Sequence, residues 1–175
     1  MPSTEIQKQL RMPLLLSKEE ADKAGSLAVF SEIVIDASAS VVREKFLDFE
    51  QWPKWTNIMH IEVAQGNLND LESKPPCKLN LKLNLDNKEE PKKIAVPTVG
   101  VNNENAFAWG ASMPLLFKVD HVFLFETVAD DETKTRFVHY EYAGGMIGVV
   151  MKGMMKKMPQ AYDKFNADFK KFVEE

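Results

Sequence analysis

Residues 78–86 alternate strictly between apolar and polar side chains, with leucine at positions 79, 81, 83 and 85 and lysine, asparagine or aspartate between them. Because successive side chains of a β-strand point to opposite faces, this pattern predicts a strand with one apolar face and one solvated face. An antiparallel sheet can expose one face to water, whereas a parallel sheet is usually covered on both. The chain is therefore expected to form an antiparallel sheet whose apolar face is covered by another element.

The same period of two recurs in most of the chain after residue 26, in segments separated by short polar loops. Loops of hairpin length join antiparallel strands, because a parallel connection needs a crossover of about a dozen residues or more. We therefore predict a curved antiparallel sheet of about six or seven strands. The predicted strands cover residues 27–36, 58–64, 78–85, 92–101, 105–112, 117–128 and 133–142.

The period changes to a helical one near the C-terminus, which predicts a long helix over roughly 145–174. Pro159 lies inside this segment and should either kink one long helix or begin its second half. A shorter helical pattern around Phe46 ends near Pro53. Only the C-terminal helix is long enough to cover the sheet, so we expect an α+β fold in which the sheet wraps around this helix. Its apolar stripe consists of Ile147, Val150, Met154, Met158, Phe165, Phe169 and Phe172.

Length and composition are typical of one globular domain, with 175 residues of which 45% are hydrophobic. Residues 1–26 lack a sustained period, so we assign them to an N-terminal extension and residues 27–175 to a single domain. A net charge of −4 gives no general attraction to phosphate, and nucleic acid is not expected as a partner. No apolar run reaches the ~20 residues of a membrane-spanning helix. With the single cysteine Cys77 and no recognisable signal peptide, a cytoplasmic protein without stable membrane insertion is expected.

Several segments after residue 26 form a recognisable series. They are IVIDASASVV at 33–42, WPKW at 52–55, FAWG at 107–110, HVFLFE at 121–126 and the C-terminal residues 165–174. Together they resemble the START/polyketide cyclase (SRPBCC, Bet v-like helix-grip) superfamily over residues 27–175. The resemblance implies the helix-grip fold and a hydrophobic ligand, such as a lipid, sterol or polyketide, in an internal cavity. It implies no single activity, since members include carriers, cyclases and chaperone activators.

His121 is the polar residue of greatest interest. It shares its phase with four apolar residues of the predicted strand 117–128 and should point to the inner face of the sheet. There it could bind a ligand oxygen or transfer a proton. A core histidine that is hydrogen-bonded to a neighbouring polar group is the more common reason for such a position.

The next predicted strand offers two arrangements that the pattern leaves open. Either His139 and Glu141 face inward and form a polar end to the cavity, or Tyr140 and Tyr142 face inward. The methionines between 146 and 158 suit an adaptable binding surface, although ordinary packing beneath a helix also explains them. The candidate ligand-binding residues are Leu81, Leu83, Phe107, Trp109, Phe117, His121, Phe123, His139, Glu141, Met154 and Met158.

The common catalytic motifs, including the nucleophile elbow and the Walker and Rossmann glycine patterns, are absent from the sequence. The three histidines are not clustered, so neither a metal nor a cofactor is expected. We expect the binding or carriage of a hydrophobic small molecule, and catalysis is the less expected outcome. One alternative is a cyclase- or isomerase-like enzyme in which cavity residue His121 donates or accepts a proton. The other is a protein-interaction module related to chaperone activators. The sequence defines neither the ligand nor the oligomeric state.

The cavity should distinguish these functions. A large, empty cavity with few polar groups favours carriage, and a convergent His–Glu or His–Tyr pair beside room for a substrate favours the enzyme. A completely filled interior favours the interaction module.

Overall fold

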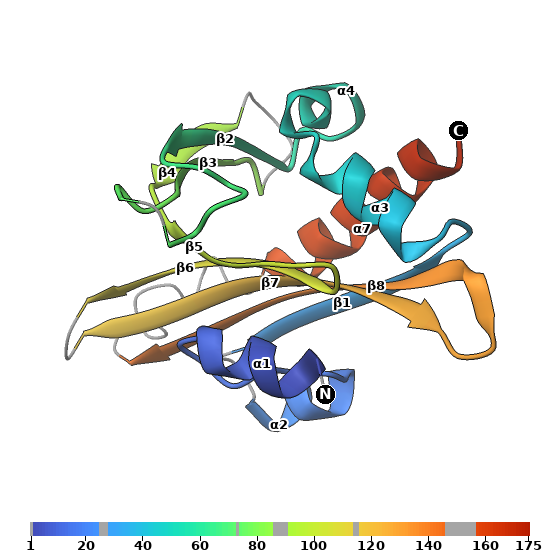
Figure 1. Cartoon of the computed structure of the whole chain (residues 1–175), viewed down its shortest axis with the longest axis horizontal. Helices are drawn as coiled ribbons and strands as arrows, with labels where there is room; N and C mark the ends of the chain where they lie inside the picture. The colour runs from blue at the N-terminus through green and yellow to red at the C-terminus, as the bar shows by residue number, and fades with distance from the viewer. Residues whose placement is uncertain (1, 25–27, 73, 86–90, 114–115, 146–156) are drawn as a thin grey trace.

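A computed structural model describes residues 2–24, 28–72, 74–85, 91–113, 116–145 and 157–175 (Figure 1). Its strands are β1 (Ala28–Ile35), β2 (Met59–Gln65), β3 (Lys78–Leu83), β4 (Lys92–Ala95), β5 (Thr98–Asn102), β6 (Ala106–Met113), β7 (Phe117–Val128) and β8 (Asp131–Gly145). Within the described ranges they form one sheet in the order β1-β8-β7-β6-β5-β3-β2, and β4 pairs with β3. All of these pairings are antiparallel.

The predicted antiparallel sheet is confirmed, and one predicted strand is divided. Segment 92–101 forms the two strands β4 and β5, with Pro97 between them. Proline has no N–H to donate to a strand ladder, which explains the interruption. The carbonyl of Pro97 instead accepts the N–H of Leu79 at 3.0 Å. The sheet curls at this point, so that β2, β3 and β4 rise on the same side as the C-terminal helix (Figure 1).

In the part of the chain that the structure describes, three helices lie on the inner face of the sheet, namely α3 (Ala39–Leu47), α4 (Trp52–Trp55) and α7 (Met158–Glu174). A 3-10 turn, η2 (Phe49–Gln51), joins α3 to α4. Pro159 lies in the first turn of α7, where a missing N–H breaks no helical hydrogen bond. Residues 146–156, which the predicted helix also covers, lie outside the described residues. The predicted α+β helix-grip arrangement, a curled sheet around a long C-terminal helix, is confirmed.

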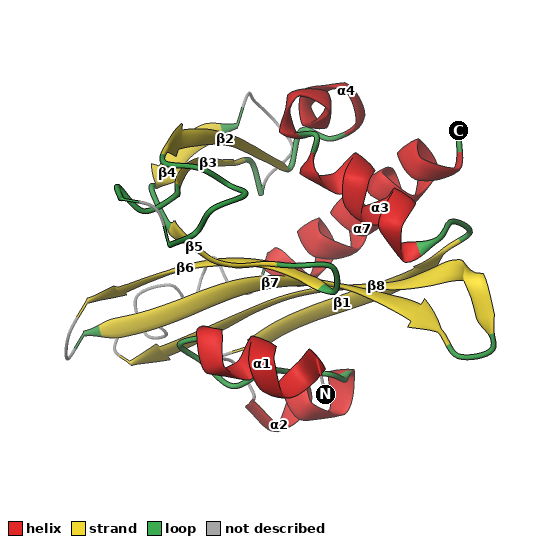
Figure 2. Ribbon diagram, in the orientation of Figure 1, coloured by secondary structure: helices red, strands yellow, loops and turns green. Residues whose placement is uncertain are grey.

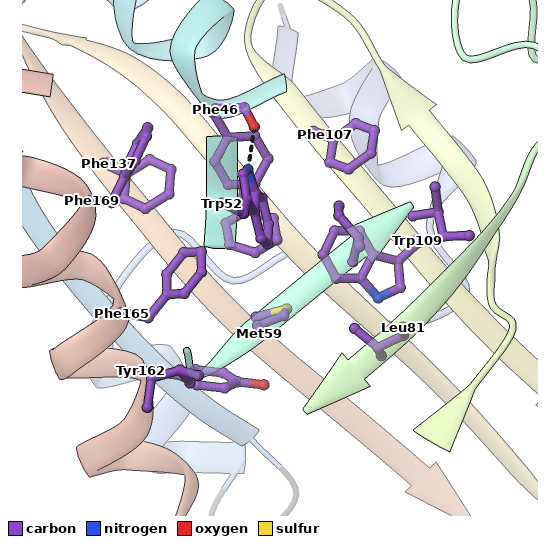
Figure 3. Close-up of a cluster of buried hydrophobic side chains, with 14 of the residues drawn as sticks. Phe46, Trp52, Met59, Leu81, Phe107, Trp109, Phe137, Tyr162, Phe165 and Phe169 are labelled. Carbon is purple, nitrogen blue, oxygen red and sulfur yellow. Dashed lines mark hydrogen bonds between the residues drawn. The ribbon is translucent and has the colours of Figure 1, made fainter. Parts of the chain in front are cut away.

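Phe46 lies at the centre of the inner core. Its ring centroid is 4.5 Å from that of Phe123 on β7 and 5.7 Å from those of Phe137 on β8 and Phe169 on α7. The carbonyl of Phe46 accepts the indole N–H of Trp52 at 2.8 Å (Figure 3). One aromatic side chain therefore joins α3 to both the sheet and the C-terminal helix.

The outer face of the sheet is covered by two N-terminal helices, α1 (Pro2–Gln9) and α2 (Lys18–Ala24), on the side opposite α7 (Figure 2). The solvated outer face predicted from residues 78–86 holds for β3, where Lys82 pairs with Glu62 at the surface. It is wrong for the central strands, whose outward side chains pack against Ile6, Leu15 and Ala21. These buried outward residues are Val101, Ala106, Ala108, Val122, Leu124, Val138 and Tyr140.

Asp120 on β7 holds the N-terminal segment on the outer face. Its carboxylate accepts the backbone N–H groups of Arg11 and Met12, and it pairs with the guanidinium of Arg11 at 3.0 Å. The Asp120 side chain is only 1% exposed. Gly110 on β6 provides the space for this contact, because a Cβ atom there would collide with the Asp120 carboxylate and the Val119 carbonyl.

Candidate functional site

A pocket of about 380 Å³ opens on the inner face, where β3, β4, β6, β7 and β8 approach the start of α7. This volume lies within the range of roughly 300–1,000 Å³ that is typical of small-molecule sites. Trp109 and Leu81 form part of its wall (Figure 3). The wall is mostly apolar and consists of Leu81, Leu83, Ile94, Ala95, Pro97, Trp109, Gly110, Ala111, Phe117, Val119, His121, Glu141 and Met158.

Two other depressions are less suited to an apolar ligand. One of about 490 Å³ lies between the end of α3 and β2, and it is lined by the carboxylates of Asp48, Glu50 and Glu62. An apolar ligand there would cover these charged groups, which is unfavourable. The other, of about 300 Å³, lies where Met12 covers Gly144 at the end of the sheet. Of these three, the inner-face pocket combines an apolar wall with convergent polar groups.

A chain of hydrogen bonds leads from this pocket to the protein surface. Nε2 of His121 lies 2.7 Å from Nε2 of His139, whose Nδ1 lies 3.1 Å from Oδ1 of Asn166. Asn166 donates from Nδ2 to the Ser31 hydroxyl at 2.9 Å, and Ser31 donates to the Asp163 carboxylate at 2.6 Å. The first four side chains are buried and Asp163 is exposed. The network therefore connects β1, β7, β8 and α7.

Glu141 forms the pocket end of this network. It lies directly opposite His121 in the pairing of β7 with β8. Its Oε2 accepts the Tyr162 hydroxyl at 3.0 Å and lies 3.3 Å from Nδ1 of His121. The His121 ring also stacks on Trp109, with centroids 4.6 Å apart. His121 and Glu141 thus form a polar pair at the wall of an otherwise apolar pocket.

Burial controls the ionisation of two members of this cluster. Burial lowers the pKa of His139 well below its usual value; the electrostatic effect of neighbouring His121 acts in the same direction and the hydrogen bond to Asn166 opposes it. Burial also raises the pKa of Tyr162 well above its usual value, and the adjacent Glu141 contributes in the same direction. Both side chains are therefore neutral near neutral pH and act as hydrogen-bonding groups rather than as charges.

Seven of the predicted site residues line the pocket, namely Leu81, Leu83, Trp109, Phe117, His121, Glu141 and Met158. Phe107, Phe123 and His139 face the same side of the sheet but are 0% exposed, in the core behind the pocket wall. Neighbouring aromatic rings surround these three side chains, so none of them faces open volume. Met154 lies outside the described residues.

The structure distinguishes the two arrangements that the pattern left open on β8. Glu141 lines the pocket and His139 lies beside it on the inner face. Tyr140 and Tyr142 belong to the outer cluster. The Tyr140 hydroxyl there accepts the N–H of Leu15 at 3.3 Å.

Sequence reasoning does not identify Tyr162, Asn166 or Ser31 as members of the polar cluster. Tyr162 and Asn166 are one helical turn apart on α7 and share its buried face with Phe165 and Phe169. A polar residue within such an apolar stripe is the signal by which Asn166 could be found. Ser31 shows no comparable signal, because a small hydroxyl residue is common on either face of a strand.

The described residues show neither a metal site nor a membrane span. No three potential metal ligands among histidine, cysteine, aspartate and glutamate come together in these ranges. None of the described helices has the length and apolar character needed to cross a bilayer. Cys77 is buried, and burial raises the pKa of its thiol, which disfavours a reactive thiolate.

Comparison with known proteins identifies the fold. No family model and no curated protein matches the sequence. The Zhui aromatase/cyclase from Streptomyces sp. R1128 superposes with a TM-score of 0.57 and 10% identity, over 84% of this chain and 93% of that one. Ara h 8.0201 gives a TM-score of 0.57 and 13% identity, over 84% and 97% of the two chains. A START superfamily protein from Mycobacterium smegmatis superposes with a TM-score of 0.50 and 16% identity, over 78% of this chain and 94% of that one.

These neighbours share the curled antiparallel sheet and the long C-terminal helix seen here. Because the sequence identity is so low, comparison of the structures detects this similarity and comparison of the sequences does not. The order of elements and the antiparallel pairing agree with what the sequence pattern predicted. The chain therefore has the helix-grip fold that is also seen in START, aromatase/cyclase and Bet v 1-like proteins.

Proposed function

We propose that this protein binds or carries a hydrophobic small molecule, such as a lipid, sterol or polyketide-like compound, in the inner-face pocket. The main support is the apolar wall around about 380 Å³, formed by Leu81, Trp109, Val119 and their neighbours. Transfer of apolar surface from water to such a wall is favourable by about 25 cal/mol per Å². An open pocket disfavours an interaction module with a filled interior. The aromatase/cyclase among the structural neighbours supports a small-molecule role by analogy of fold.

Filling the pocket should weaken this binding. Ala111 lines the pocket, whereas the adjacent Ser112 is exposed and points to the other face of β6. We expect Ala111→Phe to weaken the binding of apolar ligands by at least about tenfold, because its ring occupies the volume that the ligand needs. Ser112→Phe adds the same ring outside the pocket and should leave the affinity unchanged.

Isothermal titration calorimetry with a panel of lipids, sterols and aromatic compounds measures these affinities. The native protein should bind at least one member with micromolar affinity, equivalent to about −8 kcal/mol. A panel without any binder would contradict the proposed function. Equal affinities for the native protein and Ala111→Phe would show that the ligand occupies another part of the molecule.

A cyclase- or isomerase-like enzyme is a second candidate, favoured by the 3.3 Å contact between His121 and Glu141 at the pocket. Such a pair can exchange a proton with a bound carbonyl compound. If it does, His121→Gln should reduce the rate roughly 10²–10⁴-fold, while affinity changes by less than about tenfold. Deuterium exchange beside the carbonyl of apolar ketones, followed by NMR, measures the rate. A carrier would leave exchange at background in both proteins.

A further inference from the structure

The hydrogen-bond chain behind the pocket has one direction, which is determined at its surface end. A carboxylate accepts hydrogen bonds, so Ser31 donates to Asp163. Asn166 then donates to Ser31 from its amide nitrogen, which leaves its Oδ1 to accept from Nδ1 of His139. Neutral His139 has a single N–H, so its Nε2 is an acceptor. Nε2 of His121 must therefore donate to it across 2.7 Å.

This direction determines where the proton lies between His121 and Glu141. Because His121 uses its Nε2–H toward His139, a neutral His121 ring turns a bare Nδ1 toward Glu141. Nδ1 and Oε2 are 3.3 Å apart on residues that are 3% and 7% exposed. Two lone pairs that face each other in such a buried site repel strongly. One proton therefore lies between them, bound either to His121 or to Glu141.

The other oxygen of Glu141, Oε1, is then an acceptor in both protonation states. Oε2 is occupied by the Tyr162 hydroxyl and by the proton shared with His121. No described residue donates to Oε1. Glu141 lines the pocket and its Oε2 is already engaged, so Oε1 is the carboxylate oxygen that we infer to be available to a pocket ligand.

We propose that Glu141 selects a hydrophobic ligand that contains a hydroxyl group, whose O–H donates to Oε1. This inference rests on the proposed binding function and names the class of ligand. A hydroxyl supplies a donor that no described residue gives to Oε1, whereas an ether or a ketone of the same size presents only another acceptor. A fatty-acid carboxylate places further acceptors beside Glu141 and is disfavoured. Long-chain alcohols, sterols and phenolic compounds are thus favoured over fatty acids.

Three ligands of matched size test this selection by calorimetry at neutral pH: decanol, its isomer methyl nonyl ether, and decanoate. The native protein should bind decanol roughly tenfold to a hundredfold more tightly than the ether, because a hydrogen bond to a carboxylate is gained. Decanoate should bind most weakly. In Glu141→Gln the amide nitrogen offers a donor to the pocket, so the preference for decanol over the ether should disappear. Glu62→Gln, at an exposed glutamate on β2, should keep the native preference.

The outcomes separate this inference from the binding function on which it rests. Equal native affinities for decanol and the ether would overturn selection by Glu141 and leave apolar binding intact. A preference for decanol that persists in folded Glu141→Gln would also overturn it. Binding of none of the three ligands would overturn the binding function itself. If circular dichroism shows that Glu141→Gln does not fold, the affinities of the native protein for decanol and the ether still test whether a hydroxyl group is selected.

Discussion

Replacement of Phe46 by alanine should lower the free energy of unfolding by about 3–5 kcal/mol, the usual cost of removing a fully buried phenylalanine ring. Phe46 is 0% exposed and contacts both Phe123 on β7 and Phe169 on α7. The cavity left behind would therefore lie between the sheet and the helix that covers it. Urea unfolding followed by circular dichroism measures the change.

Val41→Ala, on the same helix, is the matched control for Phe46→Ala. The Val41 side chain is 42% exposed, so its truncation should change the free energy of unfolding by no more than about 0.5 kcal/mol. A loss below about 1.5 kcal/mol for Phe46→Ala would contradict the central position of this ring in the core.

Asp120→Ala should lower the free energy of unfolding by about 2–4 kcal/mol. The change leaves the guanidinium of Arg11 and the backbone N–H groups of Arg11 and Met12 without their acceptor. Residues 2–24 should consequently detach more easily from the outer face and become sensitive to limited proteolysis. Urea unfolding and the rate of trypsin cleavage near Arg11 measure these two effects.

Asp168→Ala provides the comparison, because Asp168 pairs with Lys164 at the surface of α7. Loss of such a surface pair should cost no more than about 1 kcal/mol and should leave the N-terminal segment protected. Similar stability losses in the two variants, or unchanged proteolysis in Asp120→Ala, would contradict the role of Asp120 in holding the N-terminal segment.

The pocket wall could be predicted from the sequence because strand alternation is a local property. Leu81, Trp109 and His121 each share one face of a strand with the apolar residues two positions away. This alternation directs all three side chains to the inner face, whichever neighbouring strands they pair with. The same reasoning could not distinguish Phe123, which is enclosed by other rings, from His121, which reaches the pocket. That distinction depends on how far α3 extends over the inner face.

The polar cluster and the covered outer face could not be predicted, because both depend on contacts between distant segments. Ser31 and Asn166 are 135 residues apart in the chain, and Arg11 and Asp120 are 109 apart. An aspartate at position 120, with inward-facing neighbours on both sides, has the pattern of a solvated residue on an outer face. The segment that covers it forms helices of only 8 and 7 residues, which are too short for a clear amphipathic period.

The location of a bound ligand tests the central claim most directly. Backbone amide NMR shifts of isotope-labelled protein can be followed during titration with decanol. Shift changes should be centred on Leu81, Val119 and Glu141, with little change at Ile6 and Ala21 on the outer face, and they should be smaller in Ala111→Phe at the same decanol concentration. Shift changes centred on the outer face, or changes of equal size in Ala111→Phe, would contradict the assignment of the inner-face pocket as the ligand-binding site.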